Sequence, residues 1–104
     1  MVRRRRYRVE YADAAVEHLR GLTAHQRAAV LDSVEVQLAH EPTLPTRNRK
    51  LLRANAVAPW ELRIGATRVY FDVVDVPQAV VTVRAVGIKV RERVTIGGVE
   101  VDLG

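Results

Sequence analysis

The feature that most constrains the fold of this chain is a change of hydrophobic period near residue 60. Before that point, apolar residues recur every three or four positions, a spacing that places them on one face of an α-helix. After it, apolar and polar residues alternate, which is typical of half-buried β-strands. Helices followed by strands in a chain of 104 residues favour a single α+β domain over residues 1–104.

Two helices are predicted in the first half of the chain. Residues 12–22 carry one apolar stripe, and a second stripe follows Thr23. Thr23 and Gln26 fit a capping box at the start of the second helix. The Glu41-Pro42 pair ends that helix, because a residue before proline avoids the α region. The connection between the helices is short, so we expect them to pack as an antiparallel pair.

Strands are predicted from alternation and turn signals. They cover residues 6–11, 60–64, 67–75, 79–87 and 93–103. The last segment contains Gly97-Gly98, a pair suited to a type I′ turn, and is predicted to form an extra C-terminal β-hairpin. Residues 41–59 hold three prolines and a basic run, and are predicted to be irregular. We expect the helical hairpin to cover one face of a mainly antiparallel sheet.

The predicted hairpin around Gly65-Ala66 contains an unusual pair of charges. This turn places Arg63 directly opposite Arg68, and like charges in that position destabilise a sheet. The face that the helices should cover carries Trp60, Leu62, Ile64, Thr67, Val69, Phe71 and Val73, joined by Val81, Val83 and Ala85. The other face carries Glu61, Arg63, Arg68, Tyr70, Asp72, Thr82 and Arg84.

Two interpretations of this polar face stay open. In the first, it is a solvated surface on which Glu61 and Asp72 neutralise the arginines. In the second, the paired guanidinium groups form an anion site, because arginine presents a rigid fork that matches phosphate. Arg93 needs neither explanation, since the C-terminal hairpin places it opposite Asp102 as an ion pair.

Composition narrows the chemistry and the partners. The net charge of +5 and the 15 Arg against 2 Lys fit an anionic partner, although a GC-rich genome also enriches arginine. The basic residues gather at 3–8, 47–53 and 89–93 and on the polar sheet face. The absence of cysteine excludes disulfides and Cys-ligated zinc, and no two of the three histidines have the spacing of a helical metal site. We therefore expect neither a metal nor a cofactor.

Cellular location is predicted from two further patterns. No apolar run approaches the length of a membrane span. Acidic residues interrupt the segment that follows the N-terminal arginines, which argues against a secretory signal. We expect a cytoplasmic protein without a membrane partner.

Three segments resemble the RelE/ParE superfamily of bacterial toxin–antitoxin toxins. "YRVEYADAAVEHLRGL" is similar to that family's opening strand and first helix. "PWELRIGATRVYFDV" is similar to its signature hairpin, and "VTVRAVGIK" to the strand that follows. The similarity covers about residues 6–93, and the hairpin is its most specific part. The resemblance implies a curved antiparallel sheet with a helical pair on its convex side.

On the RelE side, the resemblance implies a ribosome-dependent mRNA endonuclease that uses no metal. The ribose 2′-hydroxyl attacks the adjacent phosphate, and basic side chains neutralise the charge that develops there. Carried over by position, Arg63 and Arg68 would hold the phosphate, Glu61 would act as the base, and Lys89 as a further cation. The residues expected to bind RNA are Arg47, Arg49, Lys50, Arg53 and Arg84. The late Tyr or His of many active members has no counterpart here.

The implied partners are the ribosome with its mRNA and a small acidic antitoxin. One alternative is a ParE-like toxin that cleaves no RNA and acts by binding a protein such as DNA gyrase. The other is a catalytically inactive binding module with the same fold.

Overall fold

The computed structural model describes residues 5–103, so Arg3 and Arg4 of the predicted N-terminal basic cluster lie outside the described residues. The elements are β1 Arg8–Tyr11, α1 Asp13–Arg20, α2 Ala24–Leu38, β2 Arg49–Leu51, β3 Trp60–Ile64, β4 Thr67–Val74, β5 Val80–Val90, β6 Arg93–Ile96 and β7 Val99–Val101. The predicted α+β class, with two helices before most of the strands, is confirmed. Neither helix is long and apolar enough to cross a membrane, within the described range.

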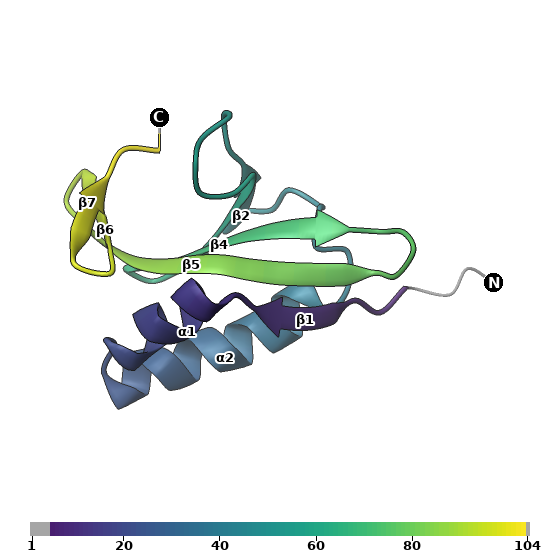
Figure 1. Cartoon of the computed structure of the whole chain (residues 1–104), viewed down its shortest axis with the longest axis horizontal. Helices are drawn as coiled ribbons and strands as arrows, with labels where there is room; N and C mark the ends of the chain where they lie inside the picture. Colours follow the sequence, from purple (N-terminus) through teal and green to yellow (C-terminus); the bar gives the residue numbers. More distant parts are fainter. Residues whose placement is uncertain (1–4, 104) are drawn as a thin grey trace.

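The described residues form one seven-stranded sheet, in which six strands follow the order β2-β3-β4-β5-β6-β7. Strand β1 lies beside β5, and this pair is the parallel exception in an otherwise antiparallel sheet. Both helices cover one face, while the loop after β2 and the C-terminal segment rise from the other (Figure 1). The two faces of the sheet therefore have different neighbours.

Local signals account for the helical pair. Thr23 Oγ1 accepts a hydrogen bond from Gln26 N at 3.1 Å, and Thr23 N donates to Gln26 Oε1 at 3.0 Å. The predicted capping box is thus confirmed at the start of α2. Helix α2 ends at Leu38, just before the Glu41-Pro42 pair.

The main core lies between the helices and the sheet. Helix α1 packs on β5, and α2 packs on β3 and β4. The rings of Trp60 and Phe71 stack there with centroids 6.1 Å apart. The buried members of this core are Ala15, Leu19, Val30, Val34, Leu38, Trp60, Leu62, Val69, Phe71, Val81, Val83 and Val86.

The predicted registers of both hairpins are confirmed. Trp60 pairs with Phe71 and Arg63 with Arg68 across the β3–β4 turn. In the C-terminal hairpin, Val94 pairs with Val101, and Gly97 and Gly98 both have positive φ.

Two details of the strands differ from the prediction. Arg93 forms its ion pair with Glu100, at 3.3 Å, rather than with the predicted Asp102, because β7 ends at Val101. Within residues 41–59, a short strand, β2, pairs with β3 instead of being irregular.

A β-bulge in β5 changes which face its later residues occupy. Tyr70 pairs with Ala85 whereas Phe71 pairs with Val83, so Arg84 is skipped in the backbone ladder with β4. The prediction that Ala85 lies on the helix-covered face is therefore wrong, and Ala85 packs with Tyr70 on the opposite face. A bulge inserts one residue and so inverts the alternation that follows it.

The face opposite the helices is only partly solvated. Tyr70 is completely buried there, in a second apolar cluster with Ala58, Ala85 and Ile96. The side chains that cover this cluster are Leu52, Val57, Val94, Val101 and Leu103. The interpretation as an open solvated face is wrong at this end of the sheet, because two distant segments fold over it.

Candidate functional site

A cavity of about 300 Å³ lies on the face opposite the helices. The segment that begins with β2 lines one side, the C-terminal residues line the other, and β3, β4 and β5 contribute between them. Its charged lining residues are Lys50, Arg53, Glu61, Arg63, Arg68, Lys89, Glu92 and Asp102. Five of these side chains are basic and three are acidic, so the cavity has a net positive charge and suits an anion.

All four residues predicted to be catalytic line this cavity. Glu61 and Arg63 come from β3, Arg68 from β4 and Lys89 from β5. Lys50 and Arg53, predicted to bind RNA, line it as well. The hairpin register already predicts that Glu61, Arg63 and Arg68 share a face, and the structure adds Lys89, Lys50 and Arg53 to them.

The bulge in β5 explains how Lys89 reaches the cavity. Simple alternation from Val81 and Val83 would put Lys89 on the helix-covered face. The extra residue at Arg84 exchanges the faces, so Val86 enters the main core and Lys89 turns to the cavity. The site therefore depends on this irregularity of the strand.

The two opposed arginines contact different partners. Arg63 Nε lies 3.3 Å from Glu61 Oε1. Arg68 Nη1 donates to the carbonyl oxygens of Gly65, at 2.6 Å, and Thr67, at 3.1 Å. The Arg63 side chain is 40% exposed, whereas Arg68 is 8% exposed. These contacts use Nε of one guanidinium group and Nη1 of the other, and so leave further N–H donors for an anion.

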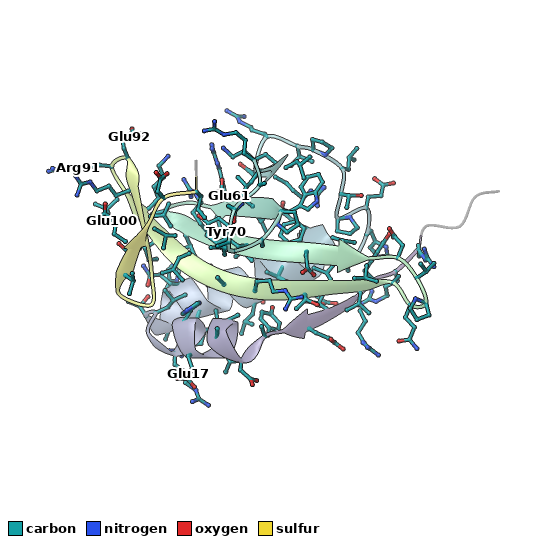
Figure 2. The ribbon with its side chains drawn as sticks, turned by 45° about the horizontal axis from the view of Figure 1, so that its top comes forward. Glu17, Glu61, Tyr70, Arg91, Glu92 and Glu100 are labelled. Carbon is teal, nitrogen blue, oxygen red and sulfur yellow. The ribbon has the colours of Figure 1, made fainter. Side chains whose placement is uncertain are left out.

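Glu61 is paired across the strands with Tyr70, beneath the cavity. Figure 2 shows the two together over the middle of the sheet, well apart from Glu17 on α1. Burial raises the pKa of Tyr70, and the Glu61 carboxylate raises it further, because ionised tyrosine would add a second negative charge. The buried hydroxyl is close enough to feel this charge but has no hydrogen-bond partner of normal geometry among the described residues.

The burial of Tyr70 is the feature of this site that the sequence analysis did not predict. Alternation correctly puts it on the face of Glu61, but alternation alone does not indicate that the side chain is buried. It is completely buried, so it offers no stacking surface. Its burial depends on the covering segments, which no local pattern around Tyr70 indicates.

The remaining residues predicted to bind RNA lie outside the cavity lining. Arg47 is exposed on the loop before β2. Arg84 is exposed on β5 and pairs with Asp72 across the strands, with its Nε 2.9 Å from Asp72 Oδ2. That pair is the neutralising contact expected of Asp72 on a solvated face.

Arg49, which is predicted to contact RNA, is buried in the structure. Arg49 is only 6% exposed, and its Nε donates to the carbonyl oxygen of Leu44 at 2.8 Å. Its Nη1 donates to the carbonyl oxygen of Gln37 in the last turn of α2. The guanidinium group therefore ties the end of α2 to the following loop.

His18 on α1 is half-buried and contacts the sheet. Its Nδ1 accepts a hydrogen bond from Val86 N at 3.2 Å, so α1 is anchored to β5. Burial lowers the pKa of His18. No cluster of three His, Asp or Glu side chains able to hold a metal occurs within residues 5–103.

Comparison with known proteins gives no match: no family model, no curated protein and no solved structure is significantly similar to this chain. The RelE/ParE resemblance therefore stays a prediction from the sequence.

Proposed function

We propose that the protein is a RelE-like toxin that cleaves mRNA on the ribosome. The observation that carries this proposal is the cavity itself, which gathers Arg63, Arg68 and Lys89 around Glu61. A site for phosphoryl transfer has to position the reacting groups and neutralise developing charge, and these side chains suit both tasks.

In the proposed reaction, the ribose 2′-oxygen forms a bond to the adjacent phosphorus, and the bond from phosphorus to the 5′-oxygen breaks. Glu61 accepts the proton of the attacking hydroxyl, and its contact with Arg63 keeps it oriented. Arg63 and Arg68 hold the phosphate oxygens, and Lys89 adds a third positive charge. The 5′-oxygen takes its proton from water.

The proposed partner that restrains the toxin is a small acidic antitoxin. The net charge of +5 and the basic lining of the cavity support a negatively charged partner.

Inducible expression followed by mapping of RNA 5′ ends tests the proposal. New in-frame cuts should appear with the natural chain, and Glu61→Gln should reduce them about 10²–10⁴-fold. Arg68→Ala should abolish the growth arrest that expression causes. Arg20→Ala should not, because Arg20 is exposed on α1, on the other side of the sheet. Growth arrest without new cuts would refute the nuclease function, and undiminished arrest with Arg68→Ala would refute this site.

A second candidate is a ParE-like toxin that blocks a protein such as DNA gyrase. It is favoured by one observation: the described residues that line the cavity include no His and no Tyr. Arrest without RNA cuts, together with recovery of gyrase from a pull-down, would support this alternative.

A further inference from the structure

The cavity has two kinds of wall. Cationic groups line one part, and aliphatic side chains line another. Of these, Leu51 is 62% exposed. The half-buried ones are Leu52, Val94, Val101 and Leu103, and we call these four residues the aliphatic wall. They come from the segment after β2, from β6, from β7 and from the C-terminal residues. Cavities that bind small molecules typically combine apolar surface with a few placed polar groups, as this one does.

The four side chains of the aliphatic wall are held in place by packing within the fold. All four of its side chains pack against the buried cluster around Tyr70 as well as lining the cavity. Val94 and Val101 are direct partners across the β6–β7 ladder. Leu52 is fixed through its backbone, since Leu52 N donates to the carbonyl oxygen of Pro59 at 2.7 Å. Each side chain is half-buried, so one side is packed and the other faces the cavity.

We propose that the aliphatic wall holds the base of a nucleotide whose phosphate lies on Arg63 and Arg68. This inference rests on the proposed function and deepens it by assigning a base subsite. A nucleotide combines a flat, weakly polar ring with an anion, and the cavity offers apolar surface beside paired guanidinium groups. The site selects for the size of the base, because the wall has no side-chain group that donates or accepts a hydrogen bond.

Selection by size should favour purine bases over pyrimidine bases. A purine buries more ring surface than a pyrimidine, and apolar burial strengthens binding in proportion to area. We expect purine nucleotides to bind about threefold to tenfold more tightly than pyrimidine nucleotides. We expect both to bind more tightly than inorganic phosphate, which reaches only the cationic part.

The test is a set of NMR titrations of the ¹⁵N-labelled full chain with adenosine 5′-monophosphate, uridine 5′-monophosphate and inorganic phosphate. Leu103→Ala should weaken binding of the adenosine nucleotide about threefold to tenfold and leave phosphate binding unchanged. Leu52→Ala, on the other side of the cavity, should do the same and serves as the second variant. Val99→Ala is the matched control, because Val99 is 65% exposed on β7 and does not line the cavity.

Several outcomes would overturn the proposal. One is a nucleotide that binds no more tightly than phosphate, and another is an equal loss of both ligands in Leu103→Ala. A short peptide of Leu and Glu that binds more tightly than the nucleotide would assign the wall to a protein partner instead. If RNA is cut but Leu103→Ala leaves the base preference at the cut unchanged, this inference fails while the nuclease function stands. Selective nucleotide binding without any RNA cutting would uphold the wall and refute the nuclease.

Discussion

Arg63 and Arg68 are direct partners across the β3–β4 ladder, yet their guanidinium groups are held by different groups. Arg63 contacts the carboxylate of Glu61, and Arg68 donates to the carbonyl oxygens of its own turn. Each contact lowers the cost of placing two cations side by side. The arrangement keeps positive charge concentrated at the cavity, where an anion can use it.

Glu61→Gln is expected to change binding and cleavage in opposite directions. Removal of one negative charge from the cavity should tighten phosphate binding by on the order of 1 kcal/mol, about fivefold. Loss of the base should slow RNA cleavage about 10²–10⁴-fold. Phosphate titration and an RNA cleavage assay of the same preparation measure both. Glu100→Gln is the control, since Glu100 pairs with Arg93 outside the cavity; slower cleavage with weaker binding would count against Glu61 as the base.

Arg49 and Lys50 are neighbours for which we predict opposite phenotypes. Arg49→Ala should lower the free energy of unfolding by about 2–4 kcal/mol, because the hydrogen bonds of a buried guanidinium group to two partly buried carbonyl groups are lost. Lys50→Ala should change the free energy of unfolding by no more than about 0.5 kcal/mol. It should lower the slope of log K for RNA binding against log salt concentration by about one, because one cation at the cavity is lost. Urea denaturation and RNA binding at several salt concentrations separate the two. A stable Arg49→Ala protein with weak RNA binding would instead support the RNA-binding prediction for Arg49.

Gly87→Ala should destabilise the attachment of the C-terminal hairpin. An added Cβ would lie 2.8 Å from Ile96 Cγ1 and 2.9 Å from Thr95 O, which is closer than van der Waals contact permits. We expect a loss of about 1–3 kcal/mol in the free energy of unfolding. Gly21→Ala is the matched control, since its Cβ would meet His18 O at an ordinary 3.5 Å and its φ is −78°. Equal stability of the two variants in urea would contradict the close approach of β5 and β6.

His18 makes stability depend on pH below neutrality. Burial holds its pKa below the ordinary 6.5, so the unfolded chain binds more protons as the pH falls. The contribution of His18 is therefore present above pH 6.5 and is lost as the pH drops toward the lowered value. Protonation also removes the Nδ1 lone pair that accepts from Val86 N.

His18→Gln should flatten this pH dependence, measured as the free energy of unfolding between pH 7 and pH 5. His25→Gln should keep it, because His25 is exposed on α2. A natural chain equally stable across the whole range would show that His18 is not protonated on unfolding.

The sequence predicted those parts of the fold that depend on short-range rules. Turn chemistry and alternation gave both hairpin registers, and the Thr23–Gln26 pair gave the start of α2. The gathering of Glu61, Arg63 and Arg68 follows from one of those registers. These features need only the geometry of neighbouring residues, so they could be derived without a structure.

The parts that escaped prediction depend on contacts between distant segments. Arg49 and Lys50 are indistinguishable in a basic run, and only the position of α2 decides which is buried. The burial of Tyr70 requires residues near both Leu52 and Leu103. Neither glycine nor proline stands beside Arg84, so the sequence does not indicate a bulge there.

The bulge also determines how this chain tolerates changes in length. Deleting Arg84 would remove the extra residue, so Val83 and Ala85 would become neighbours in a regular strand and the later residues of β5 would keep their faces and their partners on β4. Lys89 would still face the cavity and Val86 would stay in the main core. Deleting Ile88 instead would move Lys89 into the position of Ile88, on the helix-covered face. A single-codon deletion at Arg84 should therefore be much less damaging than a single-codon deletion at Ile88, four residues further along the same strand.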